Sequence, residues 1–261
     1  MTLPLLQAVT ELATLAGDEA QRHFRTGVAV EFKGDGSPVT AADRAAETVA
    51  REWIRQWFPQ DGILGEEFGI ENADAPRRWI LDPIDGTKSF IHGVALWGTL
   101  VAVVEGERVL AGAIYAPPTQ ELVAAAPGEG AWFNGRQTFV SQTASLDAAT
   151  LLTTDERFPG RPRRRERWNQ LADQARVVRT WGDCYGYLLL ATGRADVMVD
   201  DLMNPWDAAA VQVVIEEAGG KFSDFRNRPT AFGGDSIATN GALDTAVRDI
   251  LCPGGDPGLD A

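Results

Sequence analysis

Residues 79–90, WILDPIDGTKSF, carry the strongest signal in this chain. They begin as an apolar strand, so we expect Asp82 and Asp85 at the end of that strand, with a stiffening proline between them. Gly86 then permits the close approach of a ligand, and Thr87 brings a hydroxyl where a helix begins. Free amides at a helix N-terminus bind phosphate, and hard divalent cations prefer oxygen ligands. The stretch therefore predicts metal-binding carboxylates beside a cradle for a phosphate group.

Two further acidic segments stand at the ends of predicted elements. They are GEEFG (65–69), with Glu66 and Glu67, and NPWDAAA (204–210), with Asp207. Open α/β sheets bind ligands at the ends of their strands, so this placement suggests a shared site. Carboxylates about 4 Å apart, in an effective dielectric of about 20, repel one another by about 4 kcal/mol per pair. If these acids converge with those of the first stretch, the cluster must hold cations or shift its pKa values.

Each acid also has a structural explanation when taken singly. Asp207 lies in the first turn of a helix with Asn204 as its N-cap, where an acid favours the helix dipole. Asp43 can complete the helix cap that Thr40 begins. The two glutamates of GEEFG can be ordinary surface acids before a turn. Their convergence in the folded chain is what would favour a site.

Hydropathy patterns divide the chain into two halves that we expect to pack as one unit. Residues 1–148 predict an α+β half with an antiparallel sheet, and residues 149–261 predict an α/β half. Helices are expected from Leu5 onward and over 41–58, 168–175, 185–192, 205–218 and 243–251. Strands or hairpins are expected at 63–65, 79–82, 96–117, 121–135, 151–154, 177–180, 196–200, 221–223 and 236–239, with a turn at 34–38.

Charge excludes one class of partner. The 261 residues carry 24 basic and 37 acidic side chains, a formal net charge of -13. Such a surface repels phosphate backbones, which argues against binding to nucleic acid or to an anionic membrane. The one basic cluster, RPRRRER (Arg161 to Arg167), is expected to be a solvated loop rather than a binding patch.

The chain has the features of a cytoplasmic protein. Its N-terminus lacks a basic segment and a cleavage pattern, and instead has helical periodicity. The longest apolar run, 94–104, is about half of what a membrane span needs. Cys184 and Cys252 could form at most one bridge, which suggests a reducing compartment.

The sequence lacks the motifs of several other classes of phosphatase. The two acids of 79–90 are spaced D-x-x-D rather than D-x-D, and Cys184 lacks the arginine six residues later that a cysteine phosphatase needs. Neither His23 nor His92 lies in an R-H-G motif, and we expect structural or surface roles for both. Phosphate-binding loops of the G-x-x-x-x-G-K type are also missing. The remaining chemistry is metal-assisted attack of water on a phosphate ester.

Four blocks together resemble the inositol monophosphatase family of Mg²⁺-dependent phosphomonoesterases. They are KGDGSPVTAAD (33–43), GEEFG (65–69), WILDPIDGTKSF (79–90) and NPWDAAAVQVVIEEAGG (204–220), in family order and spacing. The resemblance implies a layered α-β-α-β-α sandwich, two or three Mg²⁺ ions per active site, inhibition by lithium, and a homodimer.

The resemblance also implies a set of metal ligands. Glu66, Asp82 and the backbone carbonyl of Ile84 are similar to the ligands of a first metal ion. A second ion would be held by Asp82, Asp85 and Asp207.

Catalytic and phosphate-binding roles follow from the same comparison. Glu66 with Glu67 or Asp43 would complete a weaker third metal site through water molecules. Gly86 and Thr87 would present amides to the phosphate. The Thr87 hydroxyl and Asp43 resemble the pair that orients and deprotonates the attacking water.

Within the family, GTKSFIHGVALWGTL (86–100) and WGDCYGYLLLATGRADVMVDD (181–201) are most similar to the histidinol-phosphate phosphatase branch. Asp200 stands where inositol-specific members tend to carry Glu, and Ser89 where many carry Asn. Histidinol phosphate brings an ammonium and an imidazole, for which carboxylates are the obvious partners. Asp183 and Asp200 are therefore candidates to bind its organic half.

Alternatives remain for these two residues and for the function. Asp183 could cap the helix that follows, and Asp200 or Asp201 could be surface acids at a strand end. The same chemistry could act on inositol monophosphate or on a broader set of sugar and nucleotide phosphates. In a different class, the chain could be a non-catalytic protein of transcription complexes.

Overall fold

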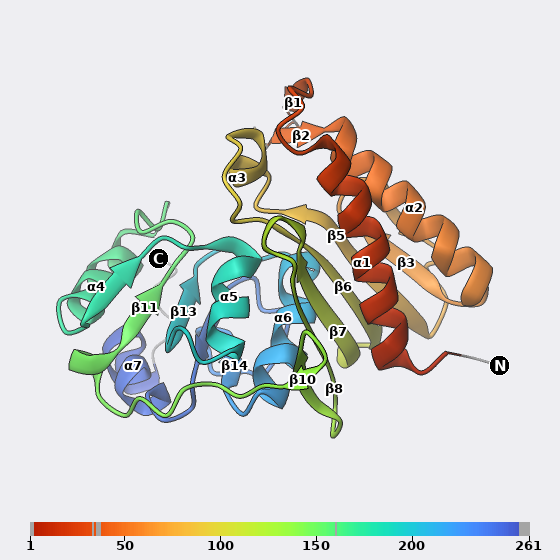
Figure 1. Cartoon of the computed structure of the whole chain (residues 1–261). Helices are drawn as coiled ribbons and strands as arrows, with labels where there is room; N and C mark the ends of the chain where they lie inside the picture. Colours follow the sequence, from red (N-terminus) through yellow and green to blue (C-terminus); the bar gives the residue numbers. More distant parts are fainter. Residues whose placement is uncertain (1–2, 33, 35–37, 160, 256–261) are drawn as a thin grey trace.

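Two long helices cover one face of the larger sheet. The computed structural model describes residues 3–32, 34, 38–159 and 161–255. In it α1 (Leu5–His23) and α2 (Ala41–Trp57) lie side by side on that face (Figure 1). Helix α2 begins with the expected capping box, in which Thr40 and Asp43 bond each other's backbone amides. The predicted turn at 34–38 lies mostly outside the described residues.

The larger sheet has eight strands in the order β10-β9-β8-β7-β6-β5-β3-β4. They are β3 (Gly62–Gly65), β4 (Gly69–Glu71), β5 (Arg77–Asp85), β6 (Gly98–Glu105), β7 (Arg108–Ala116), β8 (Glu121–Ala126), β9 (Gly130–Phe133) and β10 (Arg136–Gln137). Only the pair β3 and β5 is parallel among the neighbours described in this sheet. Val101 and Val103 of β6 pack toward α1 and α2, whereas Leu100 and Ala102 pack on the opposite face. Successive side chains of a strand point to opposite faces, so β6 contributes to the apolar core on both sides of the sheet.

The smaller sheet has five strands in the order β12-β11-β13-β15-β14. They are β11 (Thr150–Leu152), β12 (Val177–Arg179), β13 (Val197–Asp200), β14 (Lys221–Ser223) and β15 (Ser236–Thr239). Strand β11 is parallel to β12 and β13, while β15 is antiparallel to β13 and β14. The expected boundary at 148/149 falls between the last strand of the larger sheet and the first of the smaller one.

The remaining helices complete the layers. Helices α5 (Asp183–Ala191) and α6 (Pro205–Glu217) lie between the sheets, and α4 (Pro162–Ala172) and α7 (Asp244–Leu251) cover the far face of the smaller sheet (Figure 1). The predicted α-β-α-β-α sandwich is thereby confirmed. Short elements are β1 (Val30–Phe32), β2 (Pro38–Thr40), α3 (Thr87–Ile91), η1 (Pro117–Thr119), η2 (Leu146–Ala148) and η3 (Pro253–Gly255).

The core between the sheets draws on both halves of the chain. Leu100 and Ile114 of the larger sheet share one apolar cluster with Leu188 of α5, Val211 of α6 and Met198 of β13. Burial of this shared surface stabilises the position of α5 and α6 against both sheets. The N-terminal ends of these two helices are therefore held at a defined place relative to β5.

The basic cluster of 161–167 is not the loop that we predicted, because most of it belongs to α4. Arg164, Trp168 and Leu171 recur at helical spacing and are all buried. Arg164 Nη2 lies 2.8 Å from Asp235 Oδ2, and its guanidinium carbon lies 4.0 Å from the centroid of the Phe225 ring. These contacts with Asp235 and Phe225 allow an arginine to occupy the buried face of a helix. The amino-acid composition of the segment gave no sign of them.

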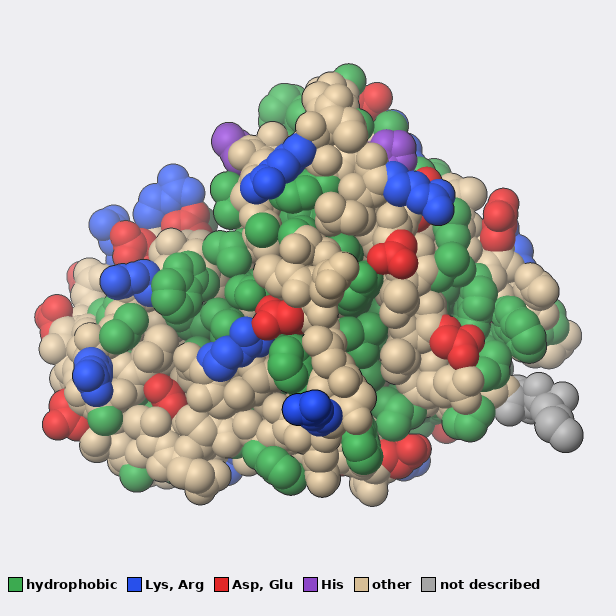
Figure 2. Space-filling model, viewed as in Figure 1, with side chains coloured by type: hydrophobic (Ala, Val, Ile, Leu, Met, Phe, Trp, Pro, Cys, Tyr) green, Lys and Arg blue, Asp and Glu red, His purple; other side chains and the backbone are tan. Residues whose placement is uncertain are grey.

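Charges of both signs share the surface. On the face shown in Figure 2, the described lysine and arginine side chains are scattered among acidic ones without forming a continuous basic band. Cys184 and Cys252 are both buried and free. Among the described helices, none is long and apolar enough to cross a membrane.

Candidate active site

A cavity of about 230 Å³ lies where β5, β11 and β13 end and where α3, α5 and α6 begin. All predicted site residues except Asp43 and Glu67 line it. The predicted residues that line the cavity are Glu66, Asp82, Ile84, Asp85, Gly86, Thr87, Asp183, Asp200 and Asp207. Acids from distant segments thus meet at strand ends, as expected for an α/β protein.

Three carboxylates form the centre of this cavity. Asp82, Asp85 and Asp207 each offer one oxygen, and these oxygens all lie within 4.8 Å of one another. In the described part of the chain, no lysine or arginine forms an ion pair with them. Burial and the neighbouring acids raise the pKa of Asp82 and Asp85 well above the usual range, and burial raises the pKa of Asp207 to about 6. Such an arrangement fits a hard cation, which would neutralise the repulsion.

Each of the three carboxylates is fixed by a backbone amide rather than by a basic side chain. Oδ1 of Asp82 accepts from the amide of Ile84 at 3.0 Å, and Oδ2 of Asp207 accepts from that of Asn204 at 2.7 Å. Oδ2 of Asp85 accepts from the amide of Cys184. For Asp207 the capping explanation is therefore correct, and the same residue also belongs to the cluster.

A buried ion pair of α2 holds the loop that contains Glu66. Glu47 accepts hydrogen bonds from the amides of Glu67 at 2.8 Å and Phe68 at 3.2 Å. Arg51 binds Glu47 at 2.7 Å and donates to the carbonyl of Gly69 at 2.5 Å. We did not predict this pair from the sequence, although two opposite charges four residues apart on the apolar face of a helix are a recognisable signal. The backbone of Glu67, rather than its side chain, makes these bonds.

Asp43 and Thr87 have separate hydrogen-bond partners. Oδ2 of Asp43 accepts hydrogen bonds from the amide of Thr40 at 2.8 Å and from its hydroxyl at 2.7 Å. Asp43 therefore completes the N-terminal cap of α2, as predicted. The Thr87 hydroxyl donates to the carbonyl of Ile84 at 3.0 Å. Burial raises the pKa of Asp43 and the charge of Glu66 adds to this rise. The pairing of Asp43 and Thr87 around a water molecule stays a prediction.

Gly86 occupies a position where a side chain would not fit. Its φ is +87°, and a Cβ there would lie 2.9 Å from the carbonyl oxygen of Leu96 and 3.1 Å from Oδ2 of Asp183. The carboxylate of Asp183 therefore faces the turn that we expect to bind phosphate. Burial, followed by repulsion from Asp200, raises the pKa of Asp183 to about 7.

Two structural alternatives for the substrate residues are wrong. Gly182 occupies the N-cap position of α5, and Asp183 makes no side-chain capping bond. Asp200 and Asp201 are 7% and 8% exposed, so neither is a surface acid. Oδ1 of Asp200 accepts from the amide of Thr154 at 2.9 Å, and its Oδ2 accepts from the hydroxyl of Tyr187 at 2.9 Å. Thr154 and Tyr187 are cavity residues that the sequence alone did not reveal.

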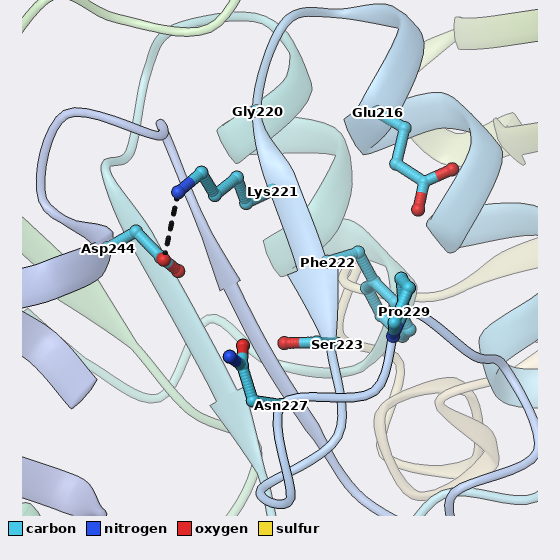
Figure 3. Close-up of a pocket in the computed structure, with 8 residues that line it drawn as sticks. All are labelled: Glu216, Gly220, Lys221, Phe222, Ser223, Asn227, Pro229 and Asp244. Carbon is cyan, nitrogen blue, oxygen red and sulfur yellow. Dashed lines mark hydrogen bonds and ion pairs between the residues drawn. The ribbon is translucent and has the colours of Figure 1, made fainter. Parts of the chain in front are cut away.

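A separate cavity of about 310 Å³ lies between the end of α6, β14 and the start of α7 (Figure 3). Lys221 and Asp244 point toward each other across it, with Nζ and Oδ2 3.1 Å apart, and Glu216 faces it from α6 (Figure 3). It shares no lining residue with the acid cavity. In this second cavity Lys221 and Asp244 neutralise each other's charge. The three central aspartates of the acid cavity have no such basic partner among the described residues.

Solved structures share this architecture. The chain is similar to the extragenic suppressor protein suhB of Bartonella henselae, with a TM-score of 0.90, 28% identity, and coverage of 96% of this chain and 99% of that one. It is similar to an IMPase of Thermotoga maritima, with a TM-score of 0.86, 31% identity, and coverage of 95% and 97%. The shared fold and the acid cavity define a phosphatase, an enzyme of the hydrolase class.

Sequence comparisons give the family. Residues 2–252 match the model of the inositol monophosphatase family, so the chain belongs to that family. It is 45% identical to a histidinol-phosphatase of Chlorobaculum parvum, over 92% of this chain and 93% of the relative. A histidinol-phosphatase of Mycobacterium tuberculosis is 38% identical, with 86% and 88% covered. A fructose-1,6-bisphosphatase/inositol-1-monophosphatase of Thermotoga maritima is 34% identical, with 82% of each covered.

Proposed function

We propose that this chain is a Mg²⁺-dependent phosphomonoesterase that hydrolyses L-histidinol phosphate to L-histidinol. The observation that carries the proposal is the convergence of Asp82, Asp85 and Asp207 within 4.8 Å at one end of β5, beside Gly86 and Thr87. The family is generally metal-dependent, and oxygen-only ligands of this charge suit Mg²⁺.

In this proposal Glu66, Asp82 and the carbonyl of Ile84 hold one Mg²⁺ ion, and Asp82, Asp85 and Asp207 hold a second. Bound there, Mg²⁺ supplies a lowered pKa for the attacking water and positive charge for the phosphoryl oxygens and the leaving alkoxide. The raised pKa values of Asp82, Asp85 and Asp207 support this fit, because burial and then the neighbouring acids disfavour the charged carboxylates, and a bound cation would favour them.

The chain's own groups supply the remaining steps. The amides of Gly86 and Thr87 bind the phosphate, and the Thr87 hydroxyl orients the water. Asp43 accepts the proton of that water, for which its burial-raised pKa is suited. Glu66 with Glu67 or Asp43 supports a third, weaker metal site. No covalent phosphoenzyme is needed.

Several observations support histidinol phosphate as the substrate. Relatives named histidinol-phosphatase are 45% and 38% identical to the chain over most of its length. The cavity also holds the carboxylate of Asp183, which is not among the proposed metal ligands and suits an ammonium or imidazolium group better than the hydroxyls of inositol. A Nus factor SuhB of Escherichia coli is 33% identical over 85% of the chain, but the assembled acid cluster favours catalysis over a pure binding role.

Phosphate release with Mg²⁺ tests the proposal. The substrates are L-histidinol phosphate, inositol 1-phosphate, a nucleoside monophosphate and adenosine 3′,5′-bisphosphate, with EDTA as the control. We expect a strong preference for L-histidinol phosphate that EDTA abolishes. Preference for inositol 1-phosphate would keep the mechanism and reject the substrate, and absence of release from every substrate would reject the enzyme.

We also propose a cytoplasmic homodimer, as the family resemblance implies. Analytical ultracentrifugation of the purified chain gives its mass in solution. A monomer at micromolar concentration would reject the dimer without affecting the assignment of the site.

A further inference from the structure

Asp183 has a backbone conformation that needs support. It is the first residue of α5, yet its φ is +51°, in the left-handed region that is uncommon for residues other than glycine, although aspartate adopts it more readily than most. Such a conformation persists when neighbouring groups hold it, and it is common at functional sites. Here it places Oδ2 of Asp183 over the turn at Gly86.

Thr154 is the neighbour that holds this backbone. Its hydroxyl accepts a hydrogen bond from the amide of Asp183 at 2.9 Å. The two segments are also in direct contact, because a Cβ on Gly182 would lie 2.4 Å from Cα of Thr154. A hydrogen bond and a close backbone contact thus fix the start of α5 against the end of β11.

Asp200 supports Thr154, and both of its oxygens already accept hydrogen bonds from the protein. Its Oδ1 accepts from the amide of Thr154, and its Oδ2 accepts from the hydroxyl of Tyr187, which also lies 2.5 Å from Oγ of Ser236. The carboxylate of Asp183, in contrast, accepts no hydrogen bond among the described residues. The two acids that sequence analysis treated alike therefore differ in their availability.

Asp183 also stands where two cavities meet. A second cavity of about 410 Å³ continues from the acid cavity, and the two share Lys88, Thr154 and Asp183. A substrate with its phosphate at Gly86 and Thr87 would extend its organic half past Asp183 into this space.

We infer that the carboxylate of Asp183 recognises the organic half of the substrate by binding its ammonium or imidazolium group. Thr154 and Asp200 are positioning residues that hold Asp183 in place for this contact. This inference rests on the proposed phosphatase function. It reassigns Asp200 from substrate contact to support of Thr154.

The experiment compares kcat/KM for L-histidinol phosphate with kcat/KM for p-nitrophenyl phosphate, an ester whose organic half carries no positive charge, at saturating Mg²⁺. The variants are Asp183→Asn, Thr154→Val, Thr154→Ser and Asp200→Asn. Thr154→Ser is the matched control, since it keeps the hydroxyl that accepts from Asp183. Thermal unfolding of each variant checks that the fold is intact.

Loss of a charge-assisted hydrogen bond is worth about a 10- to 100-fold change in binding. We expect Asp183→Asn to lower kcat/KM for L-histidinol phosphate by that factor, and Thr154→Val by about 10-fold, with p-nitrophenyl phosphate little changed. Thr154→Ser restores the preference. Asp200→Asn costs less than Asp183→Asn, because asparagine still offers an oxygen to the Thr154 amide.

Two results would overturn the inference. One is an equal loss on both esters in Asp183→Asn or Thr154→Val, which would indicate a general structural role. The other is a larger loss of preference in Asp200→Asn than in Asp183→Asn, which would make Asp200 the contact. Failure of the proposed function is distinguishable, because the unaltered chain would then release no phosphate from L-histidinol phosphate, whatever its activity on p-nitrophenyl phosphate.

Discussion

Oδ2 of Asp85 accepts the backbone amide of Cys184, a residue 99 positions further along the chain. Asp85 ends β5 of the larger sheet, and Cys184 lies in the first turn of α5, which packs between the sheets. An amide at a helix N-terminus carries partial positive charge, so it stabilises the ionised carboxylate. The acid cluster is therefore assembled from both halves of the chain.

Asp82→Asn should abolish Mg²⁺-dependent turnover while the fold stays intact. Asp82 is buried at the centre of the cluster and is proposed to bind both metal ions. Replacing a metal-supporting group typically costs 10- to 100-fold, so loss of a shared ligand should exceed about 100-fold. Asp249→Asn, on the exposed side of α7, is the matched control. Near-normal turnover in Asp82→Asn would reject the site.

Glu47→Gln should weaken Mg²⁺ binding by about 10-fold, since Glu47 holds the loop that presents Glu66. It should also lower the free energy of unfolding by about 2 kcal/mol, because Arg51 loses its buried charge partner and keeps only the more exposed Glu71. Calorimetric titration with Mg²⁺ measures the first effect and urea unfolding the second. The exposed Glu52→Gln on the same helix should change neither, and unaltered Mg²⁺ affinity in Glu47→Gln would contradict the positioning role.

Thr87→Ala should lower kcat by about 100-fold and leave the Mg²⁺ affinity nearly unchanged, because its hydroxyl is proposed to orient the water. Thr87→Ser keeps the hydroxyl and should recover most of the rate. Steady-state kinetics over a range of Mg²⁺ concentrations separates the two parameters. A Thr87→Ala enzyme that binds Mg²⁺ poorly but turns over normally at saturation would count against this assignment.

Removal of metal should make the unfolding free energy sensitive to pH through Asp207. Its pKa of about 6 in the folded chain exceeds the usual 3.8, so the folded state binds the extra proton. The stability of the metal-free chain attributable to Asp207 is therefore greatest near pH 4 and is lost as pH rises through about 6. Asp207→Asn should remove this loss, so that in EDTA at pH 7.5 the variant is up to about 3 kcal/mol more stable than the unaltered chain.

Urea unfolding at pH 4.5 and pH 7.5, each with EDTA, measures this difference. Near pH 4.5 the two proteins should have similar stability. Excess Mg²⁺ at pH 7.5 should reverse their order, because only the unaltered chain keeps all of the metal ligands. A variant that is less stable than the unaltered chain in EDTA at both pH values would show that the capping bond to Asn204 outweighs the repulsion.

The local features of this chain followed from sequence alone. The hairpin of β6 and β7, the capping box of Thr40 and Asp43, and the acids at the end of β5 depend on neighbours a few residues away. Such features involve short-range sterics and hydrogen bonds, which sequence spacing encodes directly. The family motifs likewise predicted most of the acids that line the cavity, although Asp43 and Glu67 lie outside it.

Tertiary structure alone decided the partners of the buried polar groups. Asp183 and Asp200 looked equivalent in the sequence, but they contact Thr154, 29 and 46 positions away, in different ways. Asp200 accepts a hydrogen bond from the Thr154 amide, whereas the carboxylate of Asp183 accepts none from the described residues. Arg164 appeared to belong to a solvated loop until Asp235 and Phe225 were seen to enclose it. A buried polar group is stable only with a partner, and distant elements supply that partner once the sheets and helices have packed.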